Sequence, residues 1–113
     1  MKAIVTGGAG FIGSHLVDAL LNENIEVTVL DNFSTGRLEN LDHVRNRIKL
    51  VECDLALNAE WNKHFNNADW VIHLAALADI VPSIKNPEAY FRANVNGTFN
   101  VLMAAKNAGI KRF

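Results

Sequence analysis

The residues best suited to chemistry lie near the start of the chain, where glycines recur at every third position as Gly7, Gly10 and Gly13. They stand between an apolar run over 2–5 and an amphipathic stretch from Phe11, so the pattern predicts a strand, a tight turn and a helix N-terminus. Such a turn presents unpaired backbone N–H groups and the positive end of the helix dipole to a phosphate. We expect Gly7 to take backbone angles closed to other residues, Gly10 to let the main chain approach a pyrophosphate, and Gly13 to let the helix lie against its strand. No Gly-Lys-Ser/Thr ending follows, which argues against a Walker-type loop.

An acidic residue follows the second predicted strand, which covers residues 25–30. Asp31 stands 18 residues after the last glycine of the motif, close to the spacing at which a carboxylate binds the ribose of an adenosine. A carboxylate there would repel a 2′-phosphate, so the sequence favours NAD over NADP, although Arg37 could offset that repulsion. The alternative is that Asp31 is a turn residue that caps Asn32 and Ser34.

The remaining elements continue an alternation of strands and helices within one domain, residues 1–113. After a polar loop over 31–47 with one short helical turn, we expect a strand over 48–52, a helix over 58–66, a strand over 70–74 and a helix over 87–108. The last helix has Asn86-Pro87 as a start signal and Gly109 as a stop signal. This alternation predicts an α/β fold of the Rossmann type, a doubly wound parallel sheet of order 3-2-1-4 that is truncated after its fourth strand. A ligand is expected outside the carboxyl ends of strands one and four, where the order reverses.

Other candidate site residues follow the third and fourth strands. Asp54 could accept a hydrogen bond from an adenine amino group while Leu55 covers the ring, or Asp54 could simply end its strand. The small residues of the segment 74–78 would leave room for ribose and phosphates, or could only pack. Asn94 lies on a helix that should face the sheet, and a buried amide needs partners. It is either a bridge to the backbone after the fourth strand or part of the site, and the two roles are compatible.

Composition excludes several classes of function. The net charge of −1 gives no electrostatic case for nucleic acid or for an anionic membrane. The sequence shows no signal peptide or membrane span, and one cysteine excludes an internal disulfide, so we expect a cytoplasmic protein. Cys53 is expected to be a buried, inert thiol. The four histidines lack metal-ligand spacing, and His73 is expected to be a hydrogen-bonded core residue rather than a base.

Taken in order, five motifs resemble the N-terminal part of the extended short-chain dehydrogenase/reductases, within the NAD-dependent nucleotide-sugar epimerases and dehydratases typified by UDP-glucose 4-epimerase. The motifs cover residues 5–16, 31–36, 53–55, 73–76 and 94–98. The resemblance implies NAD as the cofactor and a nucleotide-sugar as the substrate.

The resemblance also assigns roles to individual positions of the chain. It implies pyrophosphate contacts at Gly7, Gly10, Phe11 and Ile12, ribose contacts at Asp31, Asn32, Phe33, Ser34, Thr35 and Gly36, adenine contacts at Asp54 and Leu55, further cofactor contacts at Leu74, Ala75, Ala76, Leu77 and Ala78, and an ordering role for Asn94.

The family's catalytic Tyr-x-x-x-Lys pair has no match in the chain. The only tyrosine is Tyr90, and the residue four positions later is Asn94, so no catalytic residue is assigned. A fifth strand would begin over 110–113, and we expect the chain to be a truncated form or fragment. The sequence therefore predicts the cofactor-binding part of a 4-epimerase-like enzyme, with a stand-alone dinucleotide-binding module as the alternative. The uncovered edge of the fourth strand predicts self-association into a homo-oligomer.

Overall fold

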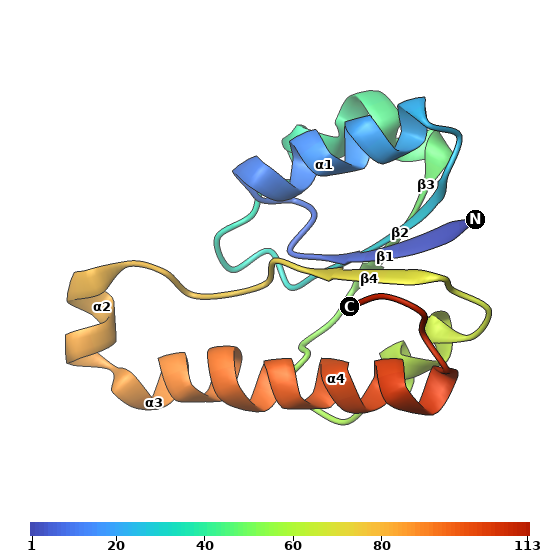
Figure 1. Cartoon of the computed structure of the whole chain (residues 1–113). Coiled ribbons are helices and arrows are strands. Elements are labelled where there is room, and N and C mark those ends of the chain that lie inside the picture. Colours follow the sequence, from blue (N-terminus) through green and yellow to red (C-terminus); the bar gives the residue numbers. More distant parts are fainter.

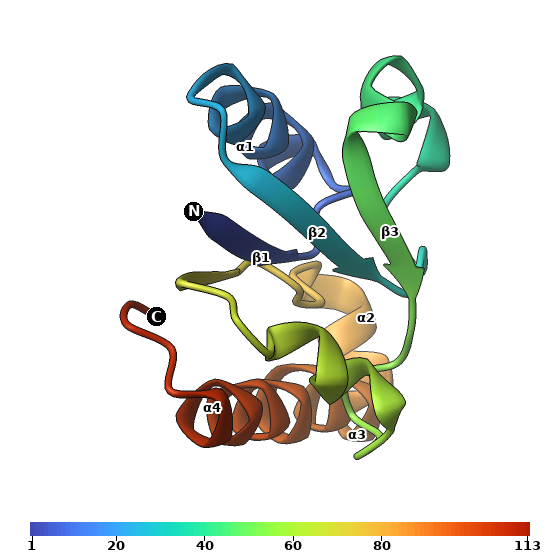
Figure 2. The same cartoon turned by 90° about the vertical axis from the view of Figure 1, so that its right-hand side faces the viewer.

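A four-stranded parallel sheet organises the chain, and the computed structural model describes every residue from Met1 to Phe113. The strands are β1 (Lys2–Thr6), β2 (Glu26–Asp31), β3 (Ile48–Glu52) and β4 (Trp70–His73). Their order is β3-β2-β1-β4 and all neighbours are parallel, which confirms the predicted α/β fold and sheet order (Figures 1 and 2). Three strands differ by one residue from the predicted ranges: β1 continues to Thr6, β2 is shifted to Glu26–Asp31, where Asp31 pairs with Glu52, and β4 ends at His73.

Side chains of the central strand β1 contribute to two separate cores, one on each face of the sheet. Ala3 and Val5 pack into the core beneath α1 (Phe11–Asn22), while Ile4 packs into the core on the opposite face. All three side chains are fully buried, because successive residues of a strand point to opposite faces and helices cover both faces here.

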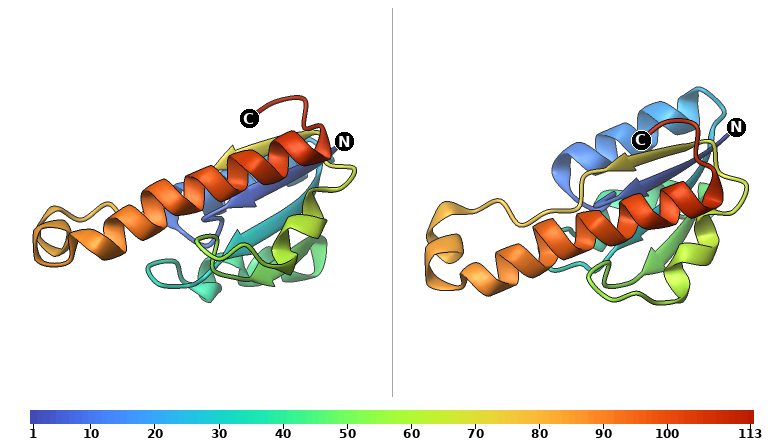
Figure 3. Two further views of the ribbon diagram at one scale, coloured as in Figure 1. Left: turned by 90° about the horizontal axis from the view of Figure 1, so that it is seen from below. Right: turned by 60° about the horizontal axis from the view of Figure 1, so that its bottom comes forward.

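A continuous helix covers the second face of the sheet (Figures 1 and 3). Its segments are α3 (Pro87–Phe91), the π-helical η3 (Arg92–Asn96) and α4 (Gly97–Ala108). The Asn86 side chain accepts from the N–H of Ala89 at 3.3 Å, and Gly109 ends the helix with a φ of 68°. The predicted helix is thus confirmed in its limits, whereas its π-helical middle has no counterpart in the prediction.

Three short helical elements differ from the expectation. The loop after β2 contains a ten-residue 3-10 helix, η1 (Leu38–Arg47), where one turn was predicted. Only Leu41 and Val44 of η1 are buried, and their spacing of three places both on one face of a 3-10 helix. The helix expected over 58–66 is the 3-10 element η2 (Glu60–Phe65), and α2 (Ile80–Lys85) was not predicted. α2 buries no side chain, so it lacks the amphipathic pattern on which prediction depends.

The segment after the long helix returns to the outer edge of β4. No fifth strand forms; Trp70 and Arg112 make an isolated parallel bridge, in which the Val71 N–H donates to Arg112 O at 2.9 Å. The edge of β4 is therefore covered at one point. No helix combines the length and apolar character that crossing a bilayer requires.

α2 and the start of the long helix project beyond the carboxyl ends of the strands (Figure 3). The loops that leave those strand ends face the same region, so this edge of the sheet is where residues distant in sequence meet.

Candidate functional site

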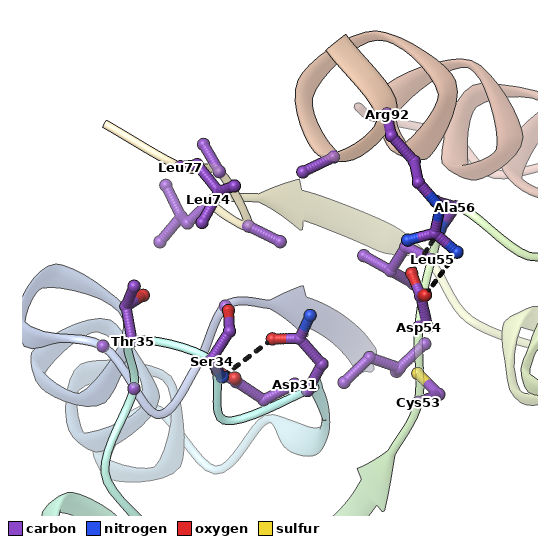
Figure 4. Close-up of a pocket in the computed structure, with 18 of the residues that line it drawn as sticks. Asp31, Ser34, Thr35, Cys53, Asp54, Leu55, Ala56, Leu74, Leu77 and Arg92 are labelled. Carbon is purple, nitrogen blue, oxygen red and sulfur yellow. Dashed lines mark hydrogen bonds and ion pairs between the residues drawn. The ribbon is translucent and has the colours of Figure 1, made fainter. Parts of the chain in front are cut away.

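A groove of about 260 Å³ opens at the carboxyl ends of the four strands (Figure 4). Every strand contributes the loop that follows it, so the sheet order brings together segments up to seventy residues apart. The predicted site residues that line the groove are Gly7, Gly10, Asp31, Asn32, Ser34, Thr35, Gly36, Asp54, Leu55, Leu74, Ala75, Ala76 and Leu77.

Other predicted site residues lie outside this lining, and some lining residues were not predicted. The predicted residues outside it are Phe11, Ile12, Gly13, Phe33, Ala78 and Asn94. The lining residues that were not predicted as site residues are Leu30, Cys53, Ala56, Ala89, Arg92 and Ala93. Three of the latter flank predicted positions on the same strand ends, and that adjacency could have identified them. The other three come from the long helix, whose approach to the groove is a tertiary feature.

Backbone atoms of the protein leave no room for a side chain at two positions of the glycine turn. Gly7 has a φ of +70°, and a Cβ there would lie 2.7 Å from the N atom of Ala75. A Cβ on Gly13 would lie 2.2 Å from Gly7 O. These contacts agree with the roles predicted for Gly7 and Gly13. A Cβ on Gly10 would meet only Gly7 O, at 3.3 Å, so the protein itself tolerates a small side chain there.

The backbone N–H groups of the turn fall into two sets. Those of Gly7, Ala9 and Gly10 are bound internally, to Leu30 O, the Asp31 carboxylate and Gly7 O respectively. The first hydrogen bond of α1 runs from Ser14 N–H to Gly10 O, and no side chain caps the helix.

The N–H groups of Gly8, Phe11, Ile12 and Gly13 have no acceptor within the chain, and the last three of these open helix α1. Phe11 and Ile12 are exposed, at 79% and 69%. Free donors at the positive end of a helix dipole are suited to an anionic group.

Asp31 is buried at 7% exposure and ties the glycine turn to the loop after β2. Its Oδ2 accepts from Ala9 N–H at 2.9 Å and its Oδ1 from Phe33 N–H at 2.8 Å. The turn-capping alternative is thus observed in altered form, because Asp31 caps Phe33 while Asn32 itself accepts from Ser34 N–H at 3.0 Å. Each carboxylate oxygen keeps a further lone pair, so a ribose hydroxyl could still donate to it.

Asp54 lies on the opposite wall, paired with a residue from the long helix. Its Oδ2 lies 2.7 Å from Nη2 of Arg92, and its Oδ1 accepts from Ala56 N–H at 2.9 Å (Figure 4). Burial favours the neutral carboxyl, but the hydrogen bonds from Arg92 and Ala56 outweigh it and hold the pKa of Asp54 below its ordinary value. Asp54 is therefore an ionised acceptor at the groove.

Cys53 is half-buried beside these carboxylates. Burial, together with the charges of Asp31 and Asp54, raises the pKa of Cys53 to about 12. The thiol is therefore protonated at neutral pH and unreactive, as predicted.

The loop after β4 is held at both of its ends. Thr6 Oγ1 accepts from Leu74 N–H and Ala75 N–H at 3.1 and 3.2 Å. Asn94 accepts from Leu77 N–H and donates to Leu77 O, both at 2.8 Å. Asn94 is thus a bridge to the backbone after the fourth strand, the first of the two roles considered for it. Figure 4 shows Leu74 and Leu77 across the groove from Ser34 and Thr35.

Comparison with known proteins gives consistent results along the whole chain. The profile of the NAD dependent epimerase/dehydratase family matches residues 3–113. UDP-glucuronic acid decarboxylase 1 from Arabidopsis thaliana is 42% identical over 98% of this chain and 25% of its own length. UDP-glucose 4-epimerase from Haemophilus influenzae is 39% identical over 100% of this chain and 35% of its own length.

A solved structure gives the same picture in three dimensions. The UDP-glucose 4-epimerase of Thermus thermophilus, in complex with NAD, superposes with a TM-score of 0.88 at 38% identity over 97% of this chain and 35% of that protein. The chain thus spans about a quarter to a third of the length of these relatives.

Proposed function

Because the chain belongs to the NAD dependent epimerase/dehydratase family, we propose that it binds NAD in the groove, as the cofactor-binding part of an enzyme that acts on a nucleotide-sugar. The observation that carries this proposal is the row of free N–H groups at Phe11, Ile12 and Gly13, directly beside a groove lined by the loops of all four strands. A dinucleotide has one feature for each part of this arrangement: a diphosphate, a ribose and an adenine.

The residues present fit such a cofactor. The open side of Gly10 leaves the helix N-terminus accessible to a diphosphate. The spare lone pairs of Asp31 would hold ribose hydroxyls, and ionised Asp54 would accept from the adenine amino group. When bound, NAD supplies a hydride acceptor and donor. The chain's own part is to bind that group, to orient it and to shield one side of it.

Selectivity for NAD over NADP is proposed to come from Asp31. Its carboxylate is fixed by two backbone N–H groups and cannot turn away from a 2′-phosphate. Arg37 is exposed, and its own N–H donates to Ala9 O at 3.0 Å. We propose that its exposed cationic side chain compensates too little to reverse the preference.

The complete enzyme is proposed to transfer a hydride reversibly between NAD and a carbon of a UDP-sugar, in the manner of a 4-epimerase. Among these 113 residues no Tyr-x-x-x-Lys pair is present to move the sugar's hydroxyl proton. Tyr90 lies on α3, and the amide of Asn94, four residues on, is engaged with Leu77. We therefore propose that this chain alone binds the cofactor without turnover. A cytoplasmic location is proposed because the single cysteine, Cys53, excludes an internal disulfide, which fits a reducing compartment.

Calorimetric titration of the 113-residue chain with NAD and with NADP tests the proposal. We expect saturable binding of NAD, at least about tenfold tighter than that of NADP, which corresponds to about 1.4 kcal/mol. The NAD-loaded chain should not interconvert UDP-glucose and UDP-galactose. Absence of NAD binding contradicts the cofactor assignment, and turnover contradicts the argument from the missing catalytic pair.

Self-association through the outer edge of β4 is proposed as well. That edge is covered only by the bridge to Arg112, and uncovered strand edges pair readily with other chains. Light scattering at tens of micromolar should show a mass above that of the monomer. A monodisperse monomer for the unmodified chain contradicts the proposal.

A further inference from the structure

His73 is a titratable side chain that the proposed function leaves unused. It ends β4 at the point where the loop of the groove begins, and it is half-buried. Its Nδ1 lies 2.7 Å from Thr6 Oγ1 on β1, and its Nε2 lies 2.9 Å from Thr98 Oγ1 on α4. The ring therefore joins a strand of the sheet to the long helix that covers it.

The donor and the acceptor of each hydrogen bond around His73 can be assigned, starting from the Asn94 carbonyl. Thr98 Oγ1 lies 2.6 Å from Asn94 O, and a carbonyl oxygen can only accept, so the hydroxyl proton of Thr98 points there. Thr98 must then accept from His73, which places the imidazole proton on Nε2. The bare Nδ1 is left to accept the hydroxyl proton of Thr6. One neutral tautomer of His73 satisfies the whole network.

We call the hydrogen-bonded series Thr6–His73–Thr98–Asn94 the relay. Both of its ends hold the loop over residues 74–77, which lines the groove. At one end, the two lone pairs of Thr6 Oγ1 serve the N–H groups of Leu74 and Ala75. At the other end, Asn94 is bonded through its carbonyl to Thr98 and through its side-chain amide to both backbone groups of Leu77. The conformation of residues 74–77 thus depends on a connected set of bonds with His73 at its centre.

We propose that His73 is a positioning residue for the cofactor groove: as a neutral imidazole it keeps the loop over residues 74–77 in its binding conformation, and its protonation releases that loop. A proton on Nδ1 would replace an acceptor by a donor. The hydroxyl of Thr6 has no lone pair left for that donor, and its own proton would lose its acceptor. The network has no second arrangement that satisfies all its members.

The surroundings of His73 favour the neutral ring. Burial lowers the pKa of His73 below its ordinary value of 6.5. From the C-terminal segment the Phe113 ring faces it, with 6.1 Å between ring centroids. The charged groups of the packed elements are engaged elsewhere, since Asp69 pairs with Lys111 and the Arg112 guanidinium lies over the Trp70 ring. No carboxylate stabilises a charged imidazole.

The sign of the pH effect follows from this lowered pKa. Between the ordinary and the lowered value, the unfolded or released state binds the proton and the native state does not. The stability that the relay gives the loop is therefore complete above about pH 6.5 and is lost as the pH falls through that value towards the folded-state pKa.

The first test needs no ligand. Long-range ¹H–¹⁵N NMR of the 113-residue chain reports the tautomer of His73, and amide spectra from about pH 8 to about pH 5 report the loop. We expect the Nε2–H tautomer, and amide signals of Leu74, Ala75 and Leu77 that move with the titration of His73. His64→Gln is the matched control, because the pKa of His64 is also lowered by burial but this ring makes no contact with the loop. The proposal would be overturned by an Nδ1–H tautomer, or by loop amide shifts that do not change as His73 titrates.

The second test compares two replacements of Thr98 and, for its ligand readout, rests on the proposed function. Thr98→Val removes the hydroxyl at nearly constant shape, and we expect hydrogen-exchange protection of Leu77 and affinity for NAD each to fall about tenfold. Thr98→Ser keeps the hydroxyl and should retain both, together with the pH dependence of the loop. Equal protection of Leu77 in the two variants would overturn the proposal.

The two tests separate the relay from the cofactor assignment. If the unmodified chain does not bind NAD at about pH 8, the proposed function fails, whereas the tautomer and the loop amides still decide the relay. If Thr98→Val does not fold, the titration of the unmodified chain decides it.

Discussion

Gly13→Ala is expected to abolish NAD binding and to lower the free energy of unfolding by about 2–3 kcal/mol. The added Cβ would lie 2.2 Å from Gly7 O and 2.8 Å from the Cα of Gly8, both of which belong to the backbone of the turn. Neither atom can move aside without displacing α1 from β1, so the row of free N–H groups would lose its position beside the groove. Urea unfolding monitored by circular dichroism gives the stability, and calorimetry gives the binding.

Gly10→Ala is the matched control for that variant. Gly10 has a φ of −75°, and its added Cβ would meet only Gly7 O at 3.3 Å. The free energy of unfolding should fall by no more than about 1 kcal/mol, the usual cost of alanine at a helix N-cap. NAD binding should nevertheless weaken, because the new methyl group would occupy the approach to the helix N-terminus. Equal destabilisation by the two variants would contradict this account of the turn.

Asp31→Ala is expected to lower the free energy of unfolding by about 3 kcal/mol and to remove NAD binding. It deletes a buried carboxylate that accepts from Ala9 N–H and Phe33 N–H, and Ala9 is fully buried, so its donor would stay without a partner. The cofactor would lose both the ribose contact and the anchor of the glycine turn. Thermal and urea unfolding with and without NAD measure the two effects separately.

Two further aspartate variants sharpen that measurement. Asp31→Asn keeps one acceptor but offers an N–H₂ group to the other donor, so its stability should fall between those of the parent chain and Asp31→Ala. Asp79→Ala changes an exposed aspartate whose side chain does not cap α2, and it should leave stability and binding unchanged. Wild-type stability in Asp31→Ala would show that this carboxylate does not hold the turn.

The sequence predicted those features of the fold that depend on short-range patterns. The spacing of Gly7, Gly10 and Gly13 specifies a strand, a turn and a helix within one segment, and alternating strands and helices leave few permitted sheet orders. The start of the long helix at Asn86-Pro87 and its end at Gly109 are likewise local signals, and both were found where predicted.

The features that escaped prediction depend on contacts between distant segments. Asp31 was placed correctly at the end of its strand, but its bond to Ala9, 22 residues earlier, requires the sheet to be assembled. Arg92 lies in the π-helical segment η3, and it reaches the groove only because the helix crosses the sheet there. α2 has no buried face, and η1 follows a 3-10 repeat, so neither carries the periodicity by which helices are recognised.

The free N–H groups at the start of α1 are likewise a property of the folded turn. The sequence indicated that bare amides would be present, but the structure distinguishes those of Gly7, Ala9 and Gly10, which are bound internally, from those of Phe11, Ile12 and Gly13. In the proposed function, a diphosphate would therefore bind at the last three of these donors.

An NAD titration of the ¹⁵N-labelled chain, followed in amide ¹H–¹⁵N spectra, tests that dependence most directly. We expect saturable shifts at Phe11, Ile12 and Gly13 that are among the largest in the spectrum and give one common dissociation constant. If these three signals stay unmoved at NAD concentrations that saturate other residues, or if NAD changes nothing in the spectrum, the diphosphate does not bind at the N-terminus of α1.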